Sequence, residues 1–308
     1  MKRIFFWIII GVLVAGGAAV LLFWPLGGGR PNAGRLAVTA SFYTMAELTR
    51  QVGGDKIDVT TIIKPGVEPH DYEPTPQDIA AIHNSKLFVY NGASLELWAD
   101  KIGNELASEG IVVVRASDGI NLVPGSAEGE GAPSFDPHVW LDPVLAAREV
   151  DNIKDGLIKA DPGNRKTYEQ NATSYKAKLA DLDREFRTGL ANCGRSDIVT
   201  SHQAFAYLGR RYGLDVMAIS GLSPDEEPSP EKLAQVAQFA RQHNVKYIFF
   251  EKLVSPKLSQ TIASEVGAKT LVVDPLEGLT QDEINQGKNY LSIQRQNLAN
   301  LRLALNCN

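Results

Sequence analysis

Residues 165–190 read RKTYEQNATSYKAKLADLDREFRTGL. The apolar and aromatic residues of this stretch recur at intervals of three and four, which places them on one face of a helix. They are Tyr168, Ala172, Tyr175, Leu179, Leu182 and Phe186. The other face is charged, and no strand-like run accompanies the helix. The pattern therefore predicts a long amphipathic helix that connects two separate regions.

Both flanking regions alternate short apolar runs with amphipathic stretches. Before the long helix, strands are predicted at 36–40, 57–63, 87–90 and 111–114, and helices at 42–52, 76–84, 95–106 and 143–159. After it, strands are predicted at 198–200, 216–219, 245–250 and 271–273, and helices at 203–212, 230–244, 256–266 and 282–305.

This alternation is typical of a largely parallel sheet covered by helices. We predict an α/β fold with two lobes, each a mainly parallel sheet flanked by helices, joined by one long rigid helix. The predicted boundaries are 35–160 for the first lobe, 161–192 for the connecting helix and 193–308 for the second lobe.

The N-terminal segment predicts export. Lys2 and Arg3 precede residues 4–26, a run with no charged side chain. A helix of this length, at about 1.5 Å per residue, spans a hydrocarbon core of roughly 30 Å, and the basic flank favours leaving the rest of the chain outside. The alternative is a cleaved secretory signal, whose apolar region is usually shorter. Residues 1–34 are thus predicted to be a membrane anchor or signal with a glycine-rich tether at 27–34.

Export would place the cysteines of this chain in an oxidising compartment. There are two, Cys193 and Cys307. In an oxidising compartment such a pair is a candidate disulfide, and two unrelated buried thiols are the alternative. A bridge would tie the start of the second lobe to the C-terminus.

Composition and motifs argue against several functional classes. The formal net charge of -5 gives no reason to expect nucleic-acid binding, which usually shows a clustered basic surface. The chain has no HExxH, GxSxG, Walker-type or strand-linked GxGxxG motif. Ser201 and His202 are adjacent, and neighbouring residues rarely present both side chains to one substrate. We therefore do not expect an enzyme.

Three of the five histidines share a context. His70, His138 and His202 each follow a strand-like or loop segment and precede a helix. In an open α/β sheet, ligands bind at the carboxyl ends of strands. His83 and His243 instead fall at the ends of predicted helices, where a histidine can interact with the last carbonyls and the helix dipole. We interpret these two as structural.

Acidic residues complete the candidate site. Asp274 follows the strand at 271–273, and three imidazoles with one carboxylate suit a divalent transition metal. The alternative is that each histidine simply hydrogen-bonds to backbone. Glu251 ends the strand at 245–250 and could accept a hydrogen bond from the second ring nitrogen of a metal-binding histidine. The alternative is that it pairs with a nearby lysine or arginine. Asp142 either caps the helix beginning near residue 143 or orients His138.

Several motifs in series resemble one family. They are IKPG at 63–66, EPHDYEPTP at 68–76, DPHVWLDP at 136–143, TSHQAFAYL at 200–208, GLSP at 221–224, EPSP at 227–230 and DPL at 274–276. Together they resemble the cluster A-I solute-binding proteins of zinc and manganese ABC importers, the ZnuA/TroA-like group, over residues 35–307. The resemblance implies two lobes joined by a rigid helix, with His70 and His138 from the first lobe and His202 and Asp274 from the second binding one metal ion.

The resemblance also implies a cargo and partners. Histidine at position 202 is similar to zinc-type members, whereas manganese-type members usually carry a carboxylate there; manganese remains the alternative. The expected partners are an ABC permease and, through the N-terminal segment, the membrane, and we expect an extracytoplasmic monomer. Less favoured interpretations are a zinc-dependent hydrolase and a surface adhesin.

Two features depart from the family pattern. The segment 125–134 is short, contains Glu128 and Glu130 and has no histidine, so a metal-gathering loop is not expected. No cysteine lies near the end of the run 4–26, so a lipobox is excluded and the anchor would replace it.

Overall fold

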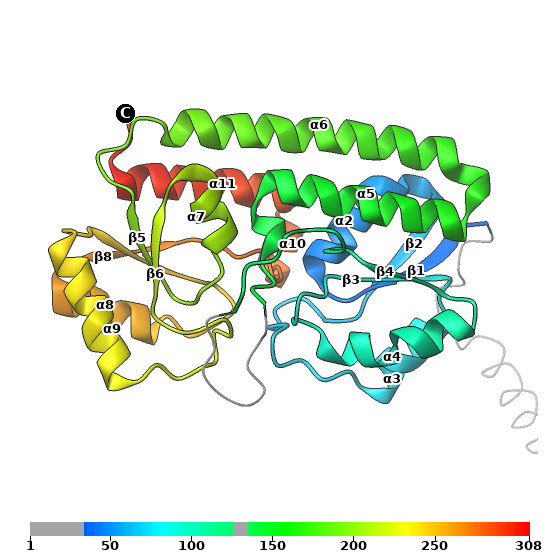
Figure 1. Cartoon of the computed structure of the whole chain (residues 1–308), viewed down its shortest axis with the longest axis horizontal. Helices are drawn as coiled ribbons and strands as arrows, with labels where there is room; N and C mark the ends of the chain where they lie inside the picture. The colour runs from blue at the N-terminus through cyan, green and yellow to red at the C-terminus, as the bar shows by residue number, and fades with distance from the viewer. Residues whose placement is uncertain (1–33, 126–134) are drawn as a thin grey trace, which may run out of the picture. The chain divides into compact units, whose positions relative to one another are not determined.

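The computed structural model describes residues 34–125 and 135–308 (Figure 1). Residues 34–308 form one compact unit. The predicted membrane anchor and most of the tether lie outside the described residues, as does nearly all of the acidic segment 125–134. Within the described ranges, no helix has the length and apolar character needed to cross a membrane.

The first half builds a four-stranded parallel sheet in the order β2-β1-β3-β4. Its strands are β1 Leu36–Ala40, β2 Ile57–Thr61, β3 Leu87–Tyr90 and β4 Val112–Arg115. Its helices are α2 Tyr43–Gly53, α3 Pro76–His83, α4 Leu97–Ser108 and α5 Pro143–Ala160, with short 3₁₀ turns at Gly54–Lys56 and Val139–Leu141.

The second half repeats the arrangement as β6-β5-β7-β8, also parallel. Its strands are β5 Asp197–Thr200, β6 Asp215–Ala218, β7 Tyr247–Phe250 and β8 Lys269–Val272. Its helices are α7 Ala206–Tyr212, α8 Pro230–Gln242, α9 Lys257–Val266, α10 Gln281–Asn285 and α11 Tyr290–Leu305. Two lobes of parallel sheet flanked by helices confirm the predicted fold class.

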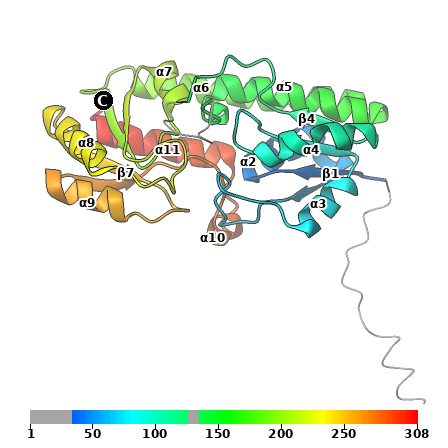
Figure 2. The ribbon, with the colours of Figure 1, turned by 60° about the horizontal axis from the view of Figure 1, so that its bottom comes forward.

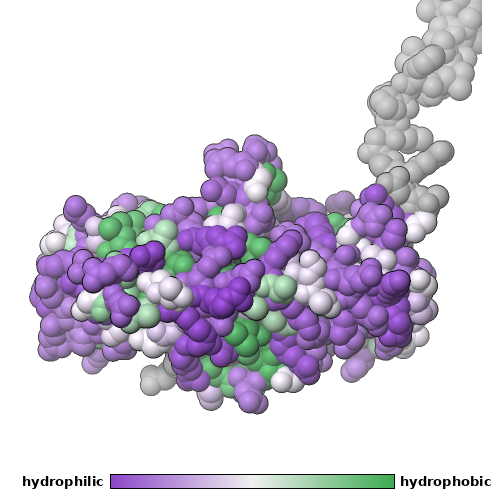
Figure 3. Space-filling view, turned by 90° about the horizontal axis from the view of Figure 1, so that it is seen from above, coloured by the Kyte–Doolittle hydropathy of each residue, from purple (hydrophilic) through white to green (hydrophobic). Residues whose placement is uncertain are grey.

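The connecting helix α6 is Arg165–Leu190, with the bounds expected from its periodicity, and it follows a 3₁₀ turn at Pro162–Asn164. The six apolar residues named above are its buried residues. It packs on α2, α5 and α11 and runs above both sheets (Figure 1, Figure 2). Seen from the α6 side, the molecule presents a mainly hydrophilic face (Figure 3).

The closing helix differs from the prediction of one continuous helix over 282–305. The chain forms α10, breaks, and resumes as α11. Gly287 takes a φ of 68° there, and Asn289 caps α11 through a reciprocal pair of bonds with Ser292. A positive φ ends a helix, and an Asn cap begins the next, so these residues set the break.

The two lobes share one hydrophobic core. It includes Phe42 and Trp140 from the first lobe and Phe205, Leu276 and Tyr290 from the second. Polar bonds cross the same boundary: the Trp140 indole donates to the Pro275 carbonyl at 2.7 Å, and the Tyr290 hydroxyl donates to the Trp140 carbonyl. This continuity fixes the loops at the facing ends of the two sheets.

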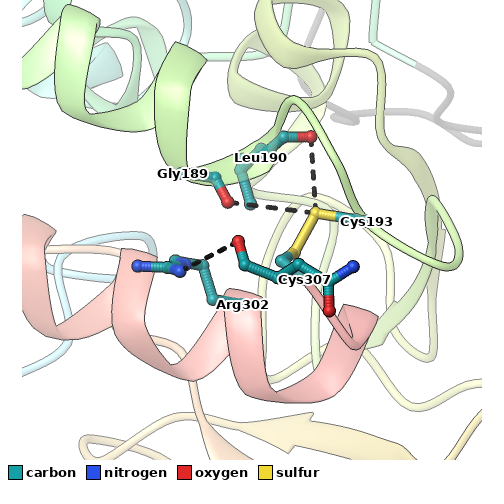
Figure 4. The surroundings of a disulfide bond; sticks show 6 residues. Gly189, Leu190, Cys193, Arg302 and Cys307 are labelled. Atoms are coloured by element: carbon teal, nitrogen blue, oxygen red, sulfur yellow. Dashed lines mark hydrogen bonds between the residues drawn. A yellow bond between two sulfur atoms is a disulfide. The ribbon is translucent and has the colours of Figure 1, made fainter.

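The predicted disulfide between Cys193 and Cys307 is present. Cys193 lies just beyond the end of α6, beside Leu190, and Cys307 just beyond α11 (Figure 4). Backbone bonds flank the bridge, from Gly194 N to Asn306 O at 3.1 Å and from Asn308 N to Asn192 O at 3.1 Å. The bridge therefore joins the ends of two helices that already pack together.

Candidate metal centre

Three imidazoles and one carboxylate meet between the lobes. His70 lies in the loop after β2, His138 immediately before the 3₁₀ turn at Val139–Leu141, His202 after β5 and Glu277 after β8. Parallel strands bring their carboxyl ends to one edge of a sheet, and the two sheets face each other across this edge. The topology thus brings together four side chains that are far apart in sequence and could hold a metal ion.

The atoms of this group are spaced as ligands around a common centre. The His138 Nε2 lies 3.2 Å from the Nε2 of His70 and 3.2 Å from that of His202. The Glu277 Oε1 lies 3.2, 3.0 and 3.3 Å from the Nε2 atoms of His70, His138 and His202. Four tetrahedral ligands at about 2.0–2.1 Å from zinc are about 3.3–3.4 Å apart. We call these four residues the ligand cluster.

Burial distinguishes the members of the ligand cluster. The side chains of His138 and His202 are 0% exposed, that of Glu277 2% and that of His70 5%. A carboxylate so deeply buried is stabilised only by partners that bear positive charge or donate hydrogen bonds. Protonated imidazoles or a metal cation both meet that need.

Two of the rings are held by carboxylates at their other nitrogen. His138 Nδ1 lies 2.8 Å from Asp136 Oδ1, and His202 Nδ1 lies 2.7 Å from Glu251 Oε1. Such partners hold each ring in one orientation, with Nε2 toward the other members of the ligand cluster. Glu251 therefore makes the ring-nitrogen contact that the first of its two predicted roles requires, and it also accepts from the Ser201 hydroxyl. Sequence reasoning missed Asp136, although this residue begins the DPH motif.

The structure does not bring Asp274 into the ligand cluster, so the prediction for this residue needs correction. Its Oδ1 accepts from the Leu276 backbone N–H at 2.8 Å, and its Oδ2 lies 3.7 Å from Lys252 Nζ. This turn leaves Leu276 at a φ of 60° and directs Glu277 inward. Asp274 shapes the loop, and the carboxylate three residues later meets the histidines.

Asp142 caps a helix, as one of its two predicted roles required. Its Oδ1 accepts from Val144 N at 2.9 Å at the start of α5, and its Oδ2 lies 2.7 Å from Arg211 Nε. It does not orient His138, because Asp136 occupies that position.

The other two histidines lie outside the ligand cluster. His83 ends α3, and its Nδ1 lies 2.6 Å from Glu109 Oε2, with Glu105 close by on the surface. His243 follows α8, stacks on Phe239 at 4.2 Å and lies 2.6 Å from Asp197. Both contact neighbouring structure, in keeping with the structural role predicted for them.

Electrostatics couple the ligand cluster into one unit. Burial lowers the pKa of His70. Burial also acts to lower the pKa of His202, but Glu251 and Glu277 outweigh it and raise that pKa well above the ordinary value. Burial acts to raise the pKa of Glu277, yet the three imidazoles hold it well below its usual range. The carboxylate is thus ionised, and protons compete with a metal for the imidazole nitrogens.

Comparison with known proteins gives this geometry a context. The family model described as ZnuA, zinc-uptake complex component A, periplasmic, matches residues 38–304. The chain belongs to this family. It is 45% identical over 280 residues to the high-affinity zinc uptake system protein ZnuA of Bacillus subtilis, covering 88% of each chain.

Other relatives are described as zinc-binding proteins or as adhesins. The chain is 39% identical to the zinc-binding lipoprotein AdcA of Streptococcus pneumoniae, and spans 56% of its length. The Zn(II)-bound ZnuA-like domain of AdcA superposes with a TM-score of 0.78, covering 88% of this chain and 99% of that domain. The laminin-binding protein Lmb of Streptococcus agalactiae, described as a bifunctional adhesin and metal transporter, superposes at 0.79 with 35% identity over 88% of this chain and 99% of Lmb.

Proposed function

We propose that this ZnuA-family chain is the extracytoplasmic zinc-capture component of an ABC importer. It would bind one zinc ion with His70, His138, His202 and Glu277 and deliver it to a membrane permease. The proposal rests mainly on one observation. Three histidine Nε2 atoms and one Glu277 carboxylate oxygen, from four loops of two lobes, lie 3.0–3.3 Å from their neighbours in the ligand cluster.

The donor set supports zinc as the cargo. Three imidazoles with one carboxylate suit zinc better than the harder manganese ion, which prefers oxygen ligands. With zinc held by these four side chains, protein atoms would fill all four tetrahedral positions and leave none open for water activation. This supports capture and release over hydrolysis.

Calorimetric titration of the exported portion, residues 35–308, with zinc tests the proposal. The expected result is one zinc per chain, and His70→Ala or His138→Ala should weaken binding by about two orders of magnitude or more. His83→Ala and His243→Ala are matched controls that remove an imidazole outside the ligand cluster and should leave affinity unchanged. Equal losses in all four variants, or no binding by the parent chain, would overturn the proposal.

Two further experiments test which metal the chain prefers and whether it works with a permease. Protein purified without chelator and offered equal zinc and manganese should retain zinc, as read by metal analysis. In cells lacking their own zinc-capture protein, the chain with its cognate permease should restore growth in zinc-depleted medium, and the His138→Ala variant should not.

A further inference from the structure

Two cavities approach the ligand cluster, and they differ in charge. One, of about 490 Å³, has His70 in its wall. The other, of about 360 Å³, has Glu277 in its wall. We call them the acidic cavity and the basic cavity, for the residues described below. Each cavity therefore offers a metal ion a route to the almost fully buried ligand cluster.

The acidic cavity is lined by four carboxylates and one cation. Asp71 and Glu73 come from the loop that carries His70, Asp225 and Glu226 come from the second lobe, and Lys101 is the cation. All four carboxylates are exposed. Within residues 34–125 and 135–308, no lysine or arginine lies within 4.0 Å of any of them. Their charge is therefore free to act on a solute cation.

The basic cavity has the opposite balance. Arg50, Lys64 and Lys288 line it together with the carboxylates of Glu47 and Glu277, and its remaining wall includes apolar side chains such as that of Leu279. With three cations against two carboxylates, a divalent cation approaching here meets a small excess of positive charge. Repulsion between like charges raises the barrier to approach.

His70 is suited to make the first contact. It is the most exposed of the three imidazoles, at 5% against 0% for His138 and His202. Within residues 34–125 and 135–308, three polar contacts join its loop to the second lobe: His70 Nε2 lies 3.2 Å from Glu277 Oε1, Gly66 N donates to Leu279 O at 3.0 Å, and Ser223 Oγ lies 3.4 Å from Asp71 Oδ2. A small shift of this loop would open the ligand cluster toward the acidic cavity.

Building on the proposed function, we propose that zinc enters through the acidic cavity, steered by Asp71, Glu73, Asp225 and Glu226, and reaches His70 first. The basic cavity is the less favourable route for a cation. Clefts lined by one sign of charge raise the association rates of oppositely charged solutes, in an ionic-strength-dependent manner. The four carboxylates therefore set the association rate and not the final coordination.

Stopped-flow association of zinc chloride with the metal-depleted chain, read by tryptophan fluorescence or a competing indicator, tests the route. The Asp225→Asn/Glu226→Gln variant should associate about threefold or more slowly at low ionic strength, with an unchanged dissociation rate. The difference should shrink in about 0.5 M salt, where charges are screened.

Two matched variants separate local steering from net charge. Asp58→Asn/Asp215→Asn makes the same charge change at exposed positions on β2 and β6, near the strand ends remote from the ligand loops. It should leave the association rate unchanged. Lys64→Gln/Lys288→Gln, in the basic cavity, should leave the rate unchanged or raise it.

An equal slowing by the Asp58/Asp215 variant, or an unchanged rate in the Asp225/Glu226 variant, would overturn the route. A slowing by the Lys64/Lys288 variant would also overturn it. Equilibrium titration of the parent chain keeps this outcome distinct from failure of the proposed function, because a chain that binds one zinc at unaltered rates refutes the route alone.

Discussion

Asp274 and Glu277 lie three positions apart on one loop and have different roles. Asp274 accepts the Leu276 N–H at 2.8 Å and so shapes the turn, while Glu277 approaches three imidazoles. Sequence reasoning could place the histidines, because strand ends of a parallel sheet converge. It could not choose Glu277, because that choice depends on the positive φ of Leu276, which β-region expectations do not anticipate.

This difference gives a direct test at the residue scale. Glu277→Gln should weaken zinc affinity by about tenfold or more, because a neutral amide oxygen replaces an ionised ligand. Asp274→Asn keeps an acceptor oxygen for Leu276 N and should stay within about threefold of the parent. Calorimetric titration of both variants measures this, and a larger loss in Asp274→Asn would restore Asp274 as the ligand.

At the scale of elements, periodicity predicted α6 to the residue. An apolar repeat of three and four that runs from Tyr168 to Phe186 leaves few alternatives for the bounds of the helix. The break between α10 and α11 was missed, because the amphipathic pattern continues across Gly287 while its backbone does not. The disulfide was predicted only as a candidate, since pairing depends on two helix ends that meet in space.

The disulfide should contribute to stability without affecting the ligand cluster. Cys193→Ser/Cys307→Ser opens a covalent loop of sequence separation 114, and should lower the free energy of unfolding by about 2–4 kcal/mol. Zinc affinity should be unchanged, because other elements hold the four ligands. Urea unfolding of the double variant measures the loss of stability, and calorimetric titration measures its zinc affinity. A loss of zinc affinity together with stability would contradict this prediction.

An ion pair between α5 and α6 predicts a dependence of stability on pH. Burial acts to raise the pKa of Asp151, but Lys176, at 2.8 Å, and Lys154 outweigh it and lower that pKa. A depressed folded-state pKa adds stability above the unfolded value of about 3.9, and this is lost as pH falls through the folded pKa.

Asp151→Asn should therefore lower stability at pH 7 by roughly 0.2–1 kcal/mol, the usual range for exposed pairs, and the deficit should shrink below about pH 4. Urea unfolding at both pH values measures it. Asp155→Asn, whose side chain is 71% exposed, is the matched control and should have a smaller effect at pH 7. A deficit that grows in acid would mean that folding raises the pKa of Asp151 instead of lowering it.

For the whole molecule, the shared hydrophobic core limits how far the two lobes can move relative to each other. The sequence predicted two lobes at 35–160 and 193–308, and a parallel sheet forms within each, but Phe42, Trp140 and Leu276 pack in one cluster. Sequence patterns report the local period of each element and carry no information on how two sheets pack together. The boundaries remain a prediction about architecture, and the lobes are not expected to move as free bodies.

Zinc binding should accordingly involve loop movement and little domain closure. Small-angle X-ray scattering of the metal-depleted and zinc-loaded chain, residues 35–308, should give the same radius of gyration within error. A wide hinge, in contrast, would make the zinc-loaded form measurably more compact. Such compaction would show that the core joining the lobes opens in solution.

The central claim is that one zinc ion joins the two lobes through four specific side chains. A crystal structure of the zinc-loaded chain, with anomalous data collected on both sides of the zinc absorption edge, tests it most directly. We predict one strong peak within about 2.0–2.2 Å of the Nε2 atoms of His70, His138 and His202 and of a Glu277 carboxylate oxygen. A peak bound to Asp274 in place of Glu277, or to residues of only one lobe, would contradict the claim.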